Sequence, residues 1–184
     1  MELKPTLWRT CRVLANRSRL RILQDLMGSE PRTVNDMAAR MRMAEPLASQ
    51  YLRLLQSRGL LRSHRDGRRV WYSVQADPSV TGAAELIAAL RLALAPGDGV
   101  LREIMRTLTG FTHPRRLVVL EILSRGAREF AELQGQSGIS ARALGRHLAK
   151  LCGRGLVVAE GTRYRLCRDG SPLAKSLLAL ATRG

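Results

Sequence analysis

The chain has 184 residues, of which 45% are hydrophobic, and its 31 basic and 15 acidic residues give a formal net charge of +16. This length is enough for two domains of about 90 residues each, and the apolar content excludes a disordered tail. The charge excess indicates a polyanionic partner, and double-stranded DNA is favoured over an anionic membrane because no segment joins a long apolar face to a terminal cluster of basic residues.

The cellular location is predicted from segments that the sequence lacks. No apolar run approaches the ~20 residues that span a bilayer, and the first residues show no hydrophobic stretch of a signal peptide. Cys11, Cys152 and Cys167 are odd in number and unpatterned, which fits reduced thiols. We therefore expect a cytoplasmic, nucleoid-associated protein with no membrane partner.

Three helices are predicted first. Apolar spacing predicts helices over residues 8–15 and 18–27, and Thr33 is placed to cap a third helix that runs to Met41. Asp36 lies three residues after Thr33 and would complete a capping box.

A longer helix and a hairpin follow. The helix is expected over residues 45–58, and Gly59 provides its C-terminal stop. Two strands are expected over residues 60–64 and 69–74, and the Asp66-Gly67 pair between them favours a tight turn.

The clearest break in the chain is the Pro-Gly-Asp-Gly sequence at residues 96–99, which follows an Ala- and Leu-rich helix expected over residues 81–95. A domain boundary at Pro96 gives domains 1–95 and 96–184. Each carries a net charge of +8, from 16 basic and 8 acidic residues before Pro96 and 15 basic and 7 acidic residues from it onward.

The second domain repeats the order and apolar spacing of the first, roughly 96 positions later. Its helices are expected over residues 100–109, 114–124, 128–136, 141–153 (after Ser140 as N-cap) and 172–182, and its strands over residues 156–159 and 163–167. The matching motifs are Leu20-Arg21-Ile22-Leu23 with Leu117-Val118-Val119-Leu120, Ser49-Gln50-Tyr51-Leu52-Arg53-Leu54-Leu55 with Gly145-Arg146-His147-Leu148-Ala149-Lys150-Leu151, and Gly59-Leu60-Leu61 with Gly155-Leu156-Val157.

The helix over residues 45–58 has a polar face suited to DNA. Pro46, Ser49, Gln50 and Arg53 share this face because they are spaced i, i+3, i+4 and i+7. The side chains expected to be buried are Leu47, Ala48, Tyr51, Leu52, Leu54 and Leu55. Ser and Gln can hydrogen-bond base edges and Arg can bind guanine or phosphate, although any amphipathic helix presents a polar face to solvent.

The next segment favours DNA more strongly. Between Arg53 and Arg69 there are six arginines and a single acid, Asp66. Arg65, Arg68 and Arg69 flank the predicted turn, where they could reach a minor groove or the DNA backbone. A solvated hairpin would normally mix the signs of its charges.

Three segments resemble ArsR-type winged-helix transcriptional regulators. Residues 14–23 resemble the first core helix of that family, residues 49–61 its recognition helix and following strand, and residues 66–72 its wing. The resemblance covers residues 8–75 and implies a DNA-binding fold and, in many members, a repressor controlled by a ligand or a metal.

Two departures bear on metal binding. Tyr51 stands where the family usually has His, and Met41-Arg42-Met43-Ala44-Glu45 replaces the family's Cys-x-Cys metal box. Cys11 and His64 remain as soft ligands in this domain, which is too few for a tetrahedral site. We expect neither a metal nor another cofactor.

The second domain is more diverged. Arg142 and Arg146 align with Pro46 and Gln50, so its helix is more cationic and less able to read bases. Its wing is shortened to residues 160–163. We interpret this domain as binding DNA phosphates. The alternative is that it is a degenerate copy that no longer binds DNA and only takes the place of a second subunit in a dimer. His147 is expected to pack at the edge of the core or to touch a phosphate.

The predicted fold is mainly α with small β-hairpins (α+β), as two tandem winged helix-turn-helix domains joined by helices. Residues 81–110 and 172–182 are expected to build an internal interface in a pseudo-two-fold monomer, with a homodimer left open. The predicted function is a non-enzymatic DNA-binding transcriptional regulator, with a repressor preferred. The alternative is an architectural, chromosome-organising protein without sequence specificity.

Overall fold

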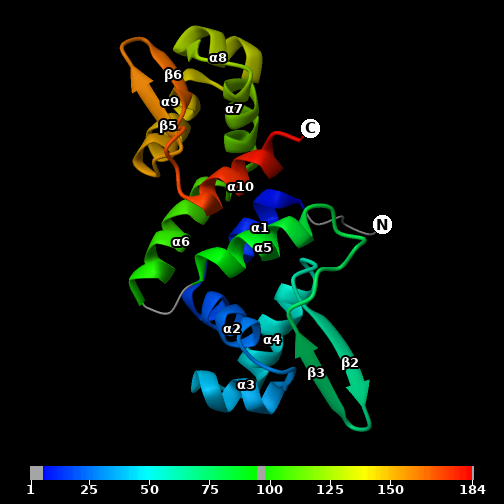
Figure 1. The fold of residues 1–184 in the computed structure, drawn as a ribbon. Coiled ribbons are helices and arrows are strands. Elements are labelled where there is room, and N and C mark those ends of the chain that lie inside the picture. Colours follow the sequence, from blue (N-terminus) through cyan, green and yellow to red (C-terminus); the bar gives the residue numbers. More distant parts are fainter. Residues whose placement is uncertain (1–5, 95–97, 184) are drawn as a thin grey trace.

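The computed structural model describes residues 6–94 and 98–183, here called the N-terminal and C-terminal halves. They form a mainly helical α+β structure with two small antiparallel sheets, which confirms the predicted fold class at this level (Figure 1). The boundary predicted at Pro96 lies outside the described residues.

The N-terminal half contains helices α1 (Leu7–Leu14), α2 (Arg17–Met27), α3 (Val34–Met41), α4 (Glu45–Gln56) and α5 (Ala83–Ala93), with strands β1 (Arg32–Thr33), β2 (Arg62–Asp66) and β3 (Arg69–Ser73). The C-terminal half contains helices α6 (Asp98–Gly110), α7 (Pro114–Ser124), α8 (Phe130–Ser137), α9 (Ala141–Gly153) and α10 (Pro172–Ala181), with strands β4 (Arg128–Glu129), β5 (Val157–Glu160) and β6 (Arg163–Leu166). All these helices begin and end within two residues of their predicted bounds.

The two sheets have the same topology. In each, the third strand of the half lies in the middle, so the orders are β1-β3-β2 and β4-β6-β5, and all pairings are antiparallel. The sequence did not predict β1 and β4, because two residues are too short to show an alternating pattern. These short strands attach α3 and α8 to the hairpins that follow α4 and α9.

The predicted strand over residues 60–64 is shifted in the structure. Strand β2 begins at Arg62 because Leu60 and Leu61 are fully buried in the core, where they connect α4 to the sheet without pairing in it. All five residues of β2 are exposed.

The predicted caps have different outcomes. Thr33 and Asp36 form the predicted capping box: the Asp36 N–H donates to Thr33 Oγ1 (3.2 Å) and the Thr33 N–H donates to the Asp36 carboxylate (3.1 Å). Hydrogen bonds from the hydroxyl and the N–H of Thr33 lower the pKa of Asp36. Ser140 does precede α9, but its side chain makes no capping hydrogen bond, so that part of the prediction was wrong.

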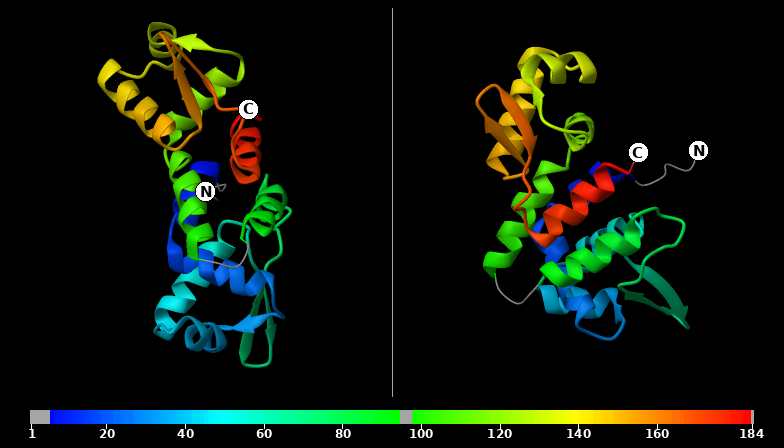
Figure 2. Two further views of the ribbon diagram at one scale, coloured as in Figure 1. Left: turned by 60° about the vertical axis from the view of Figure 1, so that its left-hand side comes forward. Right: turned by 45° about the horizontal axis from the view of Figure 1, so that its top comes forward.

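The two halves share one continuous hydrophobic core. Helix α1 packs against α6, and α5 packs against α10, so each contact joins helices from different halves (Figure 2). Buried side chains on these helices, among them Leu14, Leu90, Leu108 and Leu177, belong to a single cluster. We call this four-helix contact the seam.

One predicted core residue lies outside the core. Leu47 was expected to be buried but is 37% exposed, because at the first turn of α4 it is Ala48 that faces the core. Tyr51 and Leu54 are half-buried, while Leu52 and Leu55 are fully buried as predicted.

We predict that Gly59→Ala destabilises the protein more than the matched change Gly155→Ala. Both glycines follow a long helix at positive φ (71° and 69°), so each change introduces the strain of a left-handed conformation, about 1–2 kcal/mol. A Cβ at position 59 would also lie 2.7 Å from Val80 Cβ, whereas a Cβ at position 155 meets nothing within 4 Å. Urea unfolding should give a difference of about 1–3 kcal/mol between the variants.

The clash predicts a rescue. Adding Val80→Gly, which removes the Cβ and both Cγ atoms that the new Cβ would meet, should recover part of the loss in Gly59→Ala but none in Gly155→Ala. Equal costs for the two glycine variants would contradict the close packing of Val80 on Gly59.

Candidate nucleic-acid interface

Helices α3 and α4 form a helix-turn-helix pair held by buried apolar side chains. Met37 and Ala38 of α3 and Ala48 and Leu52 of α4 are buried, and the two helices are in contact. Pro46 lies in the first turn of α4, where its missing N–H leaves no helical hydrogen bond unmade. This packing leaves the opposite face of α4 free to meet a ligand.

The predicted reading face of α4, made of Pro46, Ser49, Gln50 and Arg53, lies at the surface. Ser49 is half-buried and the other three are exposed. Within the described part of the chain, none of these side chains makes a hydrogen bond or an ion pair. Their donors and acceptors are therefore available to a partner.

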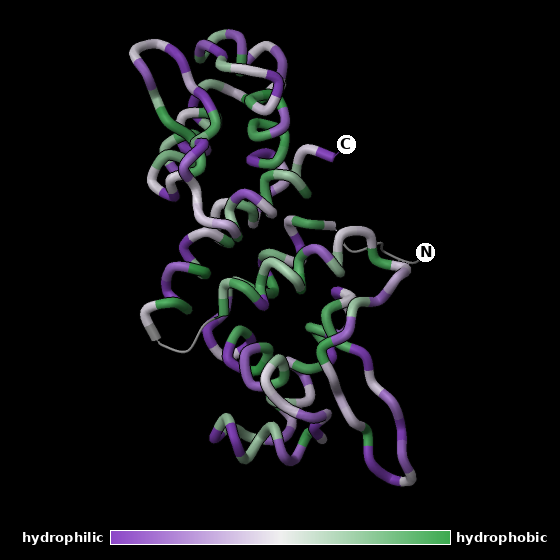
Figure 3. Tube along the Cα trace, in the orientation of Figure 1, coloured by the Kyte–Doolittle hydropathy of each residue, from purple (hydrophilic) through white to green (hydrophobic). Residues whose placement is uncertain are grey.

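The β2–β3 hairpin is a basic wing. Gly67 adopts φ 57° at its turn, and Arg65, Arg68 and Arg69 are all exposed. Figure 3 shows the hydrophilic colour along most of this hairpin. None of these three arginines forms an ion pair with another described residue, although the charge of Arg69 contributes to the lowered pKa of Asp36.

The wing is tied to the end of α4. Gln56 Nε2 on the last turn of α4 donates to Ser63 Oγ on β2 (3.0 Å), and Tyr72 on β3 is buried in the core. Gln56 and Ser63 were not predicted as a contact, since a pair seven residues apart across a helix end has no periodic signal in the sequence. These contacts fix the direction of the wing relative to the reading face.

An arginine on α2 packs against a tyrosine of α4. The Arg19 guanidinium lies 5.2 Å from the centre of the Tyr51 ring, and its Nε donates to the Val13 carbonyl. Burial lowers the pKa of Arg19. Tyr51, the departure from the ArsR pattern, thus acts as a packing partner for a cation.

The C-terminal half presents a different polar face. Arg142 and Arg146 are exposed on α9, as predicted. Its hairpin is shorter and partly neutralised, because Arg165 Nε donates to the Glu160 carboxylate (2.7 Å). Arg142 and Arg146, by contrast, form no ion pair with another described residue.

His147 packs at the edge of the core beside His113. Their ring centroids are 4.7 Å apart, and His113 Nδ1 accepts the Arg115 N–H (3.1 Å) at the start of α7. Burial lowers the pKa of both imidazoles. The neighbouring His113 lowers the pKa of His147 further, and the charges of Arg116 and Arg115 do so for both rings.

No metal centre is formed by the residues that the structure describes. Among residues 6–94 and 98–183, no three His, Cys, Asp or Glu side chains come close enough to hold an ion. Cys11 is fully buried, and burial strongly raises the pKa of its thiol. In the same ranges, no helix has the length and apolar character to cross a membrane.

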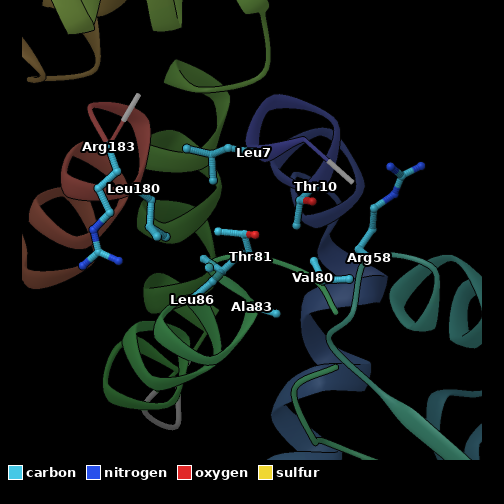
Figure 4. A pocket seen from close by; sticks show the side chains of 10 residues that line it. Leu7, Thr10, Arg58, Val80, Thr81, Ala83, Leu86, Leu180 and Arg183 are labelled. Atoms are coloured by element: carbon cyan, nitrogen blue, oxygen red, sulfur yellow. The ribbon is translucent and has the colours of Figure 1, made fainter. Parts of the chain in front are cut away.

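A small cavity lies at the seam. Its volume is about 120 Å³, and Figure 4 shows Leu7, Leu86 and Leu180 around it with Thr10 nearby. The guanidinium groups of Arg58 and Arg183 extend away from these side chains (Figure 4). The cavity is mostly apolar and does not touch the reading face of α4.

Comparison with known proteins agrees with the geometry of the N-terminal half. Residues 14–64 match the model of a family described as a helix-turn-helix domain. The matched segment contains α2, α3, α4 and the start of the wing. A search of curated proteins finds no match to the chain. The match supports a DNA-binding regulatory domain of the winged helix-turn-helix kind, a class that is usually not enzymatic.

We predict that stability falls as the pH drops from about 6.5 towards 5. Because the folded state lowers the pKa of His113 and His147, the unfolded chain takes up protons first, and this protonation stabilises the unfolded state over the interval. Above about pH 7 these histidines contribute no pH dependence. Thermal unfolding at intervals between pH 8 and pH 5 measures the effect.

His147→Gln should flatten this profile, because one of the two groups no longer titrates. His64→Gln is the matched control for replacing a histidine, since His64 is exposed on β2 and the variant keeps both His113 and His147. A wild-type melting temperature that rises as the pH is lowered from 6.5 to 5 would contradict the prediction.

Proposed function

We propose that the chain is a DNA-binding transcriptional regulator, probing the major groove with α4 and the adjacent minor groove or backbone with the β2–β3 wing. The observation that carries this proposal is that the N-terminal half presents two adjacent surfaces whose polar or basic side chains form no ion pair with another described residue. One is the reading face of α4, and the other holds Arg65, Arg68 and Arg69. A major groove admits a helix of this kind. The resemblance to ArsR-type regulators favours repression through occupancy of the operator.

The C-terminal half is proposed to be a second, diverged winged helix-turn-helix domain. Its elements and its sheet follow the same order as those of the N-terminal half. Unusual polar side chains also recur at equivalent places. Thr10 on α1 and Thr107 on α6 are both buried, and Arg19 and Arg116 each donate Nε to the backbone carbonyl six residues earlier. Periodic apolar residues alone would not require these repeated polar contacts.

The seam supports a pseudo-two-fold arrangement within one chain. Under the proposed duplication α1 corresponds to α6 and α5 to α10, so the seam pairs each helix with its own equivalent, as a two-fold axis requires. The sequence predicted this interface from residues 81–110 and 172–182, and the packing of α1 on α6 extends the proposal to α1. Within this proposal α9 grips phosphates through Arg142 and Arg146.

The domain limits in this proposal are 1–95 and 96–184. The reading face of α4 and the arginines of α9 contact one asymmetric DNA site together. The face that holds Ser49 and Gln50 favours sequence-specific regulation, because amide and hydroxyl groups discriminate base edges whereas arginines on phosphates do not.

Binding to genomic fragments and random duplex across a salt series tests the function. We expect a preferred site that is retained at higher salt, about 10³-fold or more above random DNA. Simultaneous loss of all duplexes with rising salt would indicate an architectural protein instead, and no binding at low salt would refute DNA binding altogether.

Two substitutions test the roles of helix and wing. Gln50→Ala should relax sequence preference with a modest loss on random duplex. Arg68→Ala should weaken every duplex similarly and reduce the salt slope by about 1. If both variants change sequence preference and salt slope alike, the proposed assignment of base reading to α4 and of backbone binding to the wing is wrong.

The internal seam predicts a monomer in solution. Light scattering over a wide concentration range should give the mass of one chain, about 20.4 kDa, with and without added salt. An obligate dimer would contradict the proposed pseudo-two-fold monomer without affecting the proposal of DNA binding.

A further inference from the structure

Arg42 holds an unfavourable backbone conformation between α3 and α4. It is the one non-glycine residue with positive φ in the described part of the chain (φ 51°, ψ 51°). Its N–H donates to the Ala39 carbonyl (3.2 Å), and the Met43 N–H donates to the Ala38 carbonyl (3.0 Å). This hydrogen-bond pattern ends a helix with a left-handed residue, which is usually glycine because a Cβ is disfavoured there.

The C-terminal half shows which residue the backbone itself favours at this place. Gly138, 96 positions later, ends α8 with φ 64°, and its N–H donates to the Gln134 carbonyl (3.0 Å). The same turn before the same long helix is therefore made without strain by glycine. The N-terminal half accepts strain and gains a long cationic side chain.

No described contact within the protein compensates for this strain. Arg42 is exposed, and in the described ranges its side chain forms no hydrogen bond, ion pair or stacking contact. By contrast, Arg32 and Arg40 nearby both pair with the carboxylate of Asp25. A strained residue with an unused side chain indicates a role towards a partner.

The position of Arg42 in the helix-turn-helix identifies the partner. Arg42 lies in the turn that leads into α4, four residues before Pro46, where the reading face begins. It lines an open polar depression of about 520 Å³ together with Ser18, Arg21, Arg40 and Asp25, and the Asp25 carboxylate there is paired with Arg32 and Arg40. In helix-turn-helix complexes the helix before the recognition helix crosses the DNA backbone, so a cation at this turn faces phosphates rather than base edges.

We propose that Arg42 binds a DNA phosphate beside the major groove that α4 enters, and that its strained backbone is kept for this contact. The inference rests on the proposed function and adds a residue to the interface that neither the reading face nor the wing includes. A guanidinium suits the contact because it forms paired, charge-assisted hydrogen bonds with phosphate oxygens. Gly138 leaves the C-terminal half without this contact.

The experiment measures stability and DNA binding of the same variants. Arg42→Gly should leave the melting temperature unchanged or raise it by a few degrees, because strain is relieved. Its affinity for a short random duplex at about 0.1 M salt should fall about tenfold, with a salt slope reduced by about 1. Arg42→Lys should retain part of the affinity, because it keeps the charge but not the paired hydrogen bonds of the guanidinium.

Two controls separate the explanations. Arg91→Ala removes an exposed arginine from α5 and should change the affinity by less than about twofold, which excludes a general effect of net charge. Gly138→Arg places the same side chain in the matching turn and should lower the melting temperature by about 2–8 °C.

The remaining outcomes contradict either the inference about Arg42 or the proposed function, and they can be told apart. If Arg42→Gly binds the duplex like the wild type, or if it lowers the melting temperature, the inference about Arg42 is wrong. If the wild type itself does not bind duplex DNA at low salt, the proposed function fails.

Discussion

The packing of α1 on α6 and of α5 on α10 is the contact on which the rest of the structure depends. Each half alone offers few helices around a small sheet, and a small domain buries a limited share of its surface. The seam joins their apolar faces into one core that includes Leu14, Leu90, Leu108 and Leu177. The outer elements, including both hairpins, can then be polar and exposed without loss of the fold.

The seam also determines what remains available for binding. Because α1, α5, α6 and α10 are used to join the halves, the exposed polar surfaces of α4, α9 and the β2–β3 hairpin lie on the outer parts of the molecule. Gln56 and Ser63 fix the wing to α4, and Arg19 stacks on Tyr51 of α4. A rigid support of this kind reduces the ordering that binding would otherwise require.

Much of the fold could be predicted from the sequence because its signals are local. The 3.6-residue spacing of leucines located the helices, and Thr33 with Asp36 located a helix start. Predictions from the sequence were wrong or incomplete where tertiary packing overrides the local pattern. Leu60 and Leu61 look like strand residues but are drawn into the core, Leu47 looks buried but lies on the surface, and β1 and β4 exist only because a neighbouring strand pairs with them.

By itself, the sequence determined the helical class, the excess of basic residues and the identity of the residues on the polar face of α4, because periodicity and charge are properties of the chain. Only the tertiary structure decided that α1 takes part in the seam and which helices pair there, that Gln56 contacts the wing, and that Arg42 occupies a conformation which glycine adopts in the other half. These features depend on contacts between distant segments and on backbone angles, and neither leaves a periodic mark in the sequence.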